Sequence, residues 1–190
     1  FTQLLESFLS RAGNPVTDAL AQQGFHQVTS SLMQAYLDPD SIAARTGMAL
    51  GSYLSGITLT NAGLGLVHGF ASSIGGFFPI PHGAICSALV VPSNKITIRK
   101  LRSQDGSEAL NKYAIAGKML TTQEGQNRDY YIDLLMNTLE EWVAEMSIPT
   151  LGDGGVTPKD FERIVRVTDN KNNPATLTAD EMLEVLEMAT

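Results

Sequence analysis

Residues 65–86 read GLVHGFASSIGGFFPIPHGAIC and lie inside a longer stretch, residues 46–94, that contains no Asp, Glu, Lys or Arg. So long a run without charge must be buried, either in protein or in lipid. Lipid is the poorer fit, because repeated glycines together with Pro79 and Pro81 would interrupt a membrane-spanning helix. We therefore expect this stretch to form the buried centre of a soluble domain.

Two of the three histidines, His68 and His82, stand in this stretch, 14 residues apart. Gly75, Gly76 and Pro79 lie between them, so the two histidines can occupy successive elements that converge. A neutral imidazole is a common ligand for zinc or ferrous iron, and the small neighbouring residues leave room for an ion and a substrate. The alternative is a chance pair of core histidines, each hydrogen-bonded to a backbone carbonyl.

The third histidine, His26, is flanked by glutamines and is expected to lie at the surface. Cys86 is the only cysteine, and its apolar neighbours favour a buried, inert thiol over a nucleophile. A lone cysteine forms no internal disulfide, which is typical of a reducing compartment. We expect a cytoplasmic protein, since no export signal opens the chain.

The length of 190 residues suits one domain spanning residues 1–190. The net charge is −7, and the few Lys and Arg residues are scattered, so we expect neither nucleic acid nor membrane as a partner. The chain opens on Phe1, already inside a helical pattern, and we expect it to be a fragment of a longer protein.

Apolar residues recur at helical spacing along most of the chain, which predicts an all-α fold of seven or eight helices. Asn14 or Thr17 is expected to cap the second helix, and Thr178 with Glu181 forms a capping box for the last. Pro92 is expected to end a helix over 84–91, and residues 94–99 look weakly strand-like. The remaining helices are predicted over 4–9, 17–36, from 40 onward, 107–120, 132–146 and 159–167, and the last follows the capping box at 178–181.

Three other patterns carry no chemistry. Residues 152–155 lack the Lys and Ser or Thr of a phosphate-binding loop, and residues 169–174 have Lys and Pro where a calcium loop needs a ligand and Gly. No glycine-rich turn between a strand and a helix is available for a dinucleotide. The chain therefore shows no cofactor domain of its own.

Residues 61–71 (NAGLGLVHGFA) and 81–84 (PHGA) resemble the signature of iron-containing (group III) alcohol dehydrogenases, with both motif histidines at the family's spacing. Residues 14–21 are similar to the family's segment after its first metal-binding helix, and residues 148–149, 173–174 and 177–178 to its C-terminal end. The resemblance implies the helical C-terminal half of such enzymes, in the dehydroquinate synthase-like fold.

The resemblance also implies a metal held by an Asp and a His on one helix together with His68 and His82. When the start of the chain is aligned to that helix, the position of the Asp falls just before Phe1. Gln3 then stands at the position of the His. Two possibilities remain open: a three-ligand site of Asp, His68 and His82, as in the glycerol dehydrogenase branch, or weak metal binding with Gln3 as a neutral neighbour. Ser72 stands where many members have a further His.

The function implied by this resemblance is hydride transfer between an alcohol and NAD or NADP, assisted by iron or zinc. The missing N-terminal half would supply the nucleotide-binding domain, the isolated fragment would be inactive, and the enzyme would be a homo-oligomer. The alternative function is a non-catalytic helical binding module that has lost the metal site, with His68 and His82 as packed core groups.

Overall fold

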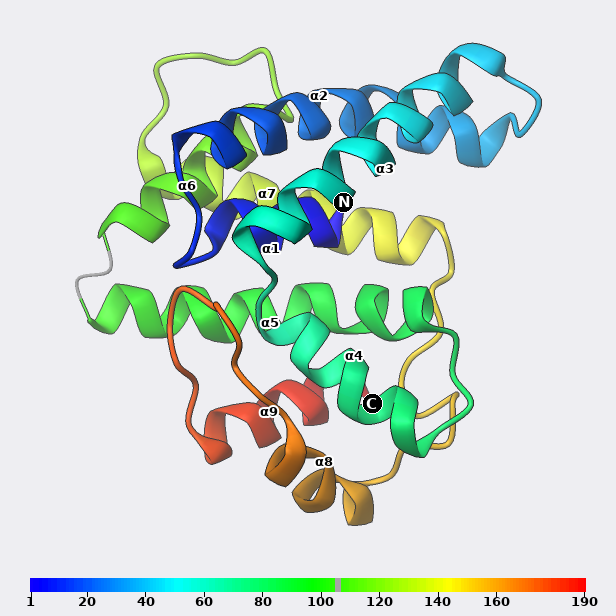
Figure 1. The fold of residues 1–190 in the computed structure, drawn as a ribbon, viewed down its shortest axis with the longest axis vertical. Coiled ribbons are helices and arrows are strands. Elements are labelled where there is room, and N and C mark those ends of the chain that lie inside the picture. Colours follow the sequence, from blue (N-terminus) through cyan, green and yellow to red (C-terminus); the bar gives the residue numbers. More distant parts are fainter. Residues whose placement is uncertain (105–106) are drawn as a thin grey trace.

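The structure is a computed structural model that describes residues 1–104 and 107–190, and over those residues it contains helices and no strands (Figure 1). The all-α prediction is confirmed. The α-helices and one short 3-10 helix, η1, are α1 (Thr2–Leu9), α2 (Pro15–Leu37), α3 (Ile42–Ala62), α4 (Leu66–Phe77), α5 (His82–Ser103), α6 (Ser107–Lys118), α7 (Arg128–Glu145), η1 (Pro158–Asp160), α8 (Phe161–Val167) and α9 (Ala179–Ala189).

The described residues form nine α-helices, which is more than the predicted seven or eight. The additional helix is α4, in the middle of the charge-free stretch. Its exposed face carries Ser72, Gly75 and Gly76 and no charged residue, so the contrast between a polar and an apolar face that marks a surface helix is weak. The predicted helix over 159–167 begins instead as the single 3-10 turn of η1.

Local sequence explains where several helices begin. The Asn14 side chain accepts hydrogen bonds from the backbone N–H groups of Val16 and Thr17, and the Thr17 hydroxyl oxygen accepts one from the Asn14 N–H. Thr178 and Glu181 make the same reciprocal pair at the start of α9. Both predicted caps are confirmed, and each satisfies backbone donors that have no partner within the helix.

Helix α5 corrects two predictions, because it continues through Pro92 and contains residues 94–99 as helix instead of strand. A proline inside a helix costs about 3 kcal/mol through its missing N–H and a clash with the preceding turn. Burial of apolar side chains such as Leu89 and Ile96 on both sides of the proline stabilises the continuous helix. Each such side chain contributes roughly 1.5–3 kcal/mol, so several together exceed the cost of the proline.

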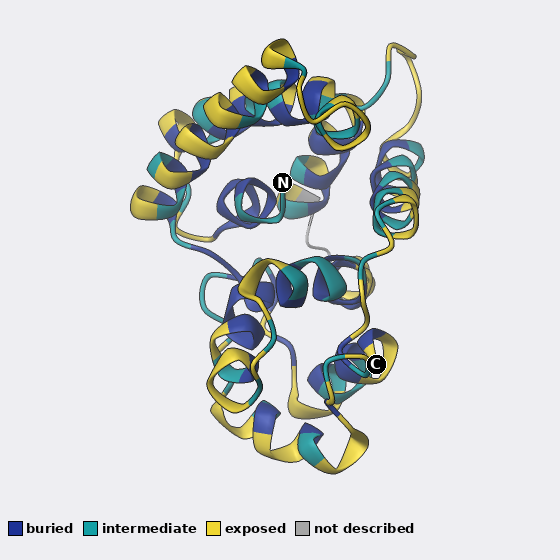
Figure 2. Ribbon diagram, turned by 90° about the vertical axis from the view of Figure 1, so that its right-hand side faces the viewer, coloured by how far each residue is buried: buried dark blue, intermediate teal, exposed yellow. Residues whose placement is uncertain are grey.

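Helix α5 separates two hydrophobic cores (Figure 1). One core packs α1, α2, α6 and α7 together, and the other packs α4, α8 and α9. Figure 2 shows that buried residues lie on the inward faces of both groups of helices. Helix α5 contributes Val90 and Ile98 to the first core, and Ile85 and Leu89 to the second. Its first turns therefore lie where elements of both cores meet.

Across the described part of the chain, every helix is too short or too polar to be a candidate for crossing a bilayer.

Candidate metal centre

Glu6 of α1 joins the two cores by reaching the N-terminal end of α4. Helix α4 has no side-chain cap of its own, since Gly65 occupies the N-cap position. The Glu6 carboxylate accepts hydrogen bonds from the backbone N–H groups of Val67, at 2.6 Å, and His68, at 3.4 Å. A negative group at this end also interacts favourably with the helix dipole. Glu6 thus fixes α4 against α1, and its side chain is buried between them, only 5% exposed.

The same carboxylate fixes the ring of His68. His68 Nδ1 lies 2.5 Å from Glu6 Oε2, and both side chains are buried. An ionised carboxylate only accepts hydrogen bonds, so in a neutral imidazole paired with it Nδ1 carries the hydrogen and Nε2 keeps a free lone pair. Metal-binding histidines are commonly oriented in this way by a carboxylate on the other ring nitrogen. The chain thus supplies an imidazole whose Nε2 is prepared to donate to an ion.

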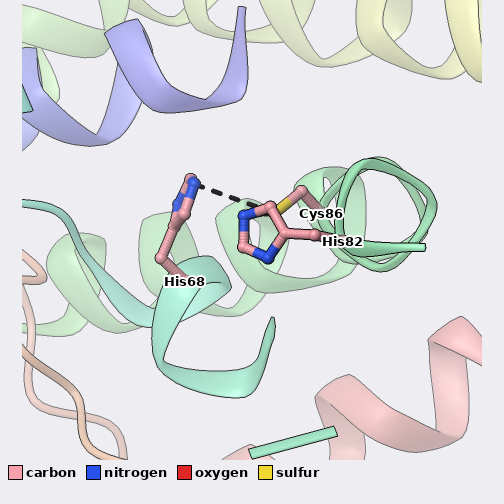
Figure 3. A group of neighbouring side chains, drawn as sticks. All are labelled: His68, His82 and Cys86. Atoms are coloured by element: carbon pink, nitrogen blue, oxygen red, sulfur yellow. Dashed lines mark hydrogen bonds between the residues drawn. The ribbon is translucent and has the colours of Figure 1, made fainter. Parts of the chain in front are cut away.

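His82 and Cys86 meet this Nε2 from the first two turns of α5 (Figure 3). They stand four residues apart, so they share one face of the helix. Cys86 Sγ lies 3.5 Å from His82 Nε2 and 3.7 Å from His68 Nε2. The two imidazole rings have centroids 5.4 Å apart. The structure thus brings His68 and His82 together, as their spacing predicted, and adds a thiol between them.

Exposure differs sharply across this group. His68 and Cys86 are buried, whereas His82 is exposed. Burial, followed by the negative charge of Glu6, raises the pKa of the Cys86 thiol to about 12. A free thiol here keeps its proton at neutral pH, and the prediction that Cys86 is buried is confirmed. The group therefore has a closed side at Glu6 and an open side at His82.

Gln3 precedes Glu6 by three residues on α1, so the two side chains lie on neighbouring positions of one helix face. Its side-chain oxygen accepts a hydrogen bond of 2.8 Å from the Ser55 hydroxyl of α3. The residue is half-buried. The role of Gln3 beside a metal stays a prediction.

Two further residues singled out in the sequence lie apart from the ligand atoms. The Ser72 hydroxyl is exposed and donates to the His68 carbonyl one turn earlier on α4, and Lys171 Nζ lies 3.5 Å from it. His26 is exposed on α2, as predicted, and serves below as a control position.

Gly69 follows His68 and permits a close approach that shapes one wall of the site. A Cβ atom at Gly69 would lie 2.0 Å from the backbone oxygen of Asp169, so only glycine fits there. The loop that contains Asp169 also carries Lys171, whose positive charge acts on Cys86. Glycine at position 69 thus brings this loop next to the first turn of α4.

The donor atoms of this group fit a divalent transition metal. One nitrogen each from His68 and His82 and the sulfur of Cys86 all lie within 4.8 Å of one another. Imidazole and thiolate are the ligands that zinc and iron commonly take. The buried carboxylate behind His68 adds the orientation that such sites use. The residues present therefore fit the metal that the sequence pattern implied, although the ligand roles of His68 and His82 stay predictions.

Sequence reasoning missed Glu6 and did not connect Cys86 to the histidines. Glu6 has a signal, because it stands in the apolar run from Leu4 to Leu9, where a buried carboxylate needs a partner. The signal for Cys86 is its spacing of four residues from His82. That spacing has meaning only once a helix is known to begin at His82.

Comparison with known proteins assigns the chain to a family. The family profile described as "Fe-containing alcohol dehydrogenase family, C-terminal" matches residues 1–190. Alcohol dehydrogenase 4 of Saccharomyces cerevisiae is 30% identical over 196 residues, which cover 99% of this chain and 48% of the relative. The 1,3-propanediol dehydrogenase of Citrobacter freundii is 30% identical over 194 residues, with the same coverage of 99% and 48%.

Solved structures show the same fold. A crystal structure of 1,3-propanediol oxidoreductase superposes with a TM-score of 0.88 at 26% identity and covers 100% of this chain and 49% of that one. The chain spans about half the length of the curated relatives it matches. The predicted family is thus confirmed: this chain belongs to the Fe-containing alcohol dehydrogenase family and corresponds to its C-terminal domain.

Proposed function

We propose that the protein containing this chain is a metal-dependent alcohol dehydrogenase, which interconverts an alcohol and an aldehyde or ketone by hydride transfer with NAD or NADP. The chain is its metal-binding half and forms one wall of the substrate cleft. The observation that carries the proposal is the convergence of His68 and His82 beside a buried carboxylate that leaves His68 Nε2 free. Relatives named for alcohol and 1,3-propanediol dehydrogenation support it.

His68 and His82 are the residues of this chain that would hold the metal. When bound, such an ion acts as a Lewis acid on the substrate oxygen. Glu6 holds the proton on Nδ1 of His68, which keeps Nε2 available and the ring in one orientation. His82 is exposed, so the substrate and the nicotinamide would approach from its side. The opposite side is closed by Glu6 and the first turn of α4.

The remaining ligands involve the segment around Gln3. The family pattern places an aspartate just before Phe1, and we propose that it completes the site with His68 and His82. Gln3 then lies beside the metal as a neutral group, with its amide oxygen engaged by Ser55. A carboxamide is a poorer donor than imidazole, which makes metal affinity lower than in a relative with histidine at this position.

The rest of the enzyme lies outside this chain. The chain covers about half of its relatives, so we assign the nucleotide-binding domain to the N-terminal half of the full-length protein. The isolated chain would then be inactive, because it lacks the site that orients the nicotinamide. We further propose that the full-length enzyme is cytoplasmic and a homo-oligomer.

The test measures alcohol-dependent reduction of NAD and NADP by the full-length protein. Metal depletion with a chelator should abolish the activity, and added Fe²⁺ or Zn²⁺ should restore it. His68→Ala should lack the restored activity, whereas His26→Ala, changed at an exposed position on α2, should behave as wild type. If the metal-loaded wild type reduced neither NAD nor NADP with any of a panel of primary alcohols, the proposal would be overturned in favour of a non-catalytic binding module.

A further inference from the structure

Building on the proposed function, we propose that Cys86 is itself a metal ligand, so that His68, His82 and Cys86 form a thiolate-containing site that favours zinc. Within the described chain, this trio is the group of His, Cys, Asp and Glu side chains whose donor atoms converge closely enough to share an ion. Thiolate ligands are soft, and they suit zinc better than a site built from imidazole and carboxylate alone does. Together with the aspartate proposed above, the trio would give four protein ligands, the number that the family pattern has when a histidine stands at position 3.

The distances within the trio match those of ligands around one tetrahedral ion. Zinc lies about 2.05 Å from an imidazole nitrogen and about 2.3 Å from a thiolate sulfur, so a tetrahedral angle separates the two donor atoms by about 3.6 Å. The structure gives 3.5 Å from Cys86 Sγ to His82 Nε2 and 3.7 Å to His68 Nε2. A right angle between the same bonds would give only about 3.1 Å. The sulfur thus lies at the tetrahedral spacing from both nitrogens.

Without an ion, weak hydrogen bonds can join the same three atoms. A thiol has one hydrogen to donate and its sulfur is also a weak acceptor, so Cys86 Sγ can donate to one ring nitrogen and accept from the other. The Glu6 carboxylate already occupies Nδ1 of His68, so Nε2 of that ring is an acceptor and cannot donate to the sulfur. An ion shared by the three atoms would replace both of these weak contacts with bonds to the metal. Its binding would displace the thiol proton to solvent.

Cys86 also accounts for the departure at Gln3. The chain has a carboxamide at the position where the family pattern has an imidazole, and the oxygen of that carboxamide already accepts a hydrogen bond from Ser55. Cys86 reaches the same two histidines from α5, on the helix face that carries His82. A thiolate from α5 therefore supplies a donor that α1 no longer provides.

The experiment loads the metal-depleted full-length protein with Co²⁺ as a spectroscopic probe. Wild type should show the intense near-ultraviolet band of thiolate-to-cobalt charge transfer. Cys86→Ser should lose that band and keep the weaker visible bands of cobalt bound by nitrogen and oxygen. His26→Ala, the control, should match the wild type. Far-ultraviolet circular dichroism verifies that each variant remains helical.

The outcomes separate this inference from the proposed function. Retention of the charge-transfer band in Cys86→Ser would overturn the ligand role of Cys86. Loss of all cobalt bands in His68→Ala would, in that case, still support the metal site of His68 and His82. Failure of the wild type to bind cobalt or zinc would overturn both. X-ray absorption of the zinc-loaded wild type decides the question without any variant. It should show one sulfur at about 2.3 Å, and a shell of nitrogen and oxygen alone would contradict the inference.

Discussion

Glu6→Gln tests the orientation of His68 by changing one atom of a buried side chain. Glu6 Oε1 accepts from the Val67 N–H at 2.6 Å, while Oε2 accepts from His68 Nδ1 at 2.5 Å. An amide has one accepting oxygen and one donating NH₂ group, so it cannot serve both contacts. If the oxygen stays with Val67, the NH₂ group faces Nδ1, and the ring must move its hydrogen to Nε2. The metal-facing nitrogen then loses its lone pair.

The expected loss follows from these contacts. Removing a carboxylate that orients a metal-binding histidine typically lowers metal affinity about 10- to 100-fold. That change corresponds to roughly 1.4–2.7 kcal/mol of binding free energy. If the amide oxygen turns to His68 instead, the Val67 N–H loses its cap, and the free energy of unfolding falls by about 1–2 kcal/mol.

The assay is a zinc titration of the full-length protein in competition with a coloured chelator, together with thermal unfolding. The matched control is Glu140→Gln, because Glu140 pairs with Lys95 between α7 and α5 on the surface, where both side chains are 43% exposed. This control should leave the zinc affinity unchanged. Wild-type zinc affinity and wild-type stability in Glu6→Gln would together refute the role of Glu6.

Three other predictions concern α1 and the core beside α5. Gln3→His should tighten metal binding in the full-length protein, and a metal titration giving equal affinities would mean that Gln3 does not face the site. Tyr113→Phe should lower the free energy of unfolding by about 1–3 kcal/mol in a denaturant titration. The buried Tyr113 hydroxyl donates to Asn94 Oδ1 at 2.6 Å, and its removal leaves that buried oxygen without a donor. Burial, with a smaller contribution from the charge of Glu6, raises the pKa of Tyr113 far above its ordinary value. The stabilisation from the neutral Tyr113 hydroxyl is therefore complete below about pH 10, the ordinary pKa of tyrosine in the unfolded chain, and it is lost as the pH rises further. The free energy of unfolding should consequently fall more steeply between pH 10 and 11 in the wild type than in Tyr113→Phe.

Local features were readable from the sequence because their causes are local. Asn14 and Thr178 cap helices through residues three positions away, and the structure confirms both. The proximity of His68 and His82 was also predictable, since a glycine and proline break separates them. Both inferences needed only short segments of the chain. The expected burial of the whole charge-free stretch was wrong, because Tyr53 on α3 is 68% exposed and His82 is exposed.

Features that depend on the tertiary fold were not readable. Glu6 contacts His68 across 62 positions of sequence, and no local pattern joins them. Helix α5 passes Pro92 because packing on two cores outweighs the local cost of a proline, which only the assembled fold can supply. The same helix aligns Cys86 with His82, so the error at Pro92 and the missed contact of Cys86 with the histidines concern one element.

The metal content of the purified full-length His82→Ala protein, measured beside wild type, tests the central claim most directly. His68 and His82 hold the same ion in this account, so removing His82 takes away one of its ligands and weakens metal binding. We predict one metal ion per chain in the wild type and less than about a tenth of that in His82→Ala. Full metal occupancy in a folded His82→Ala protein would contradict the account.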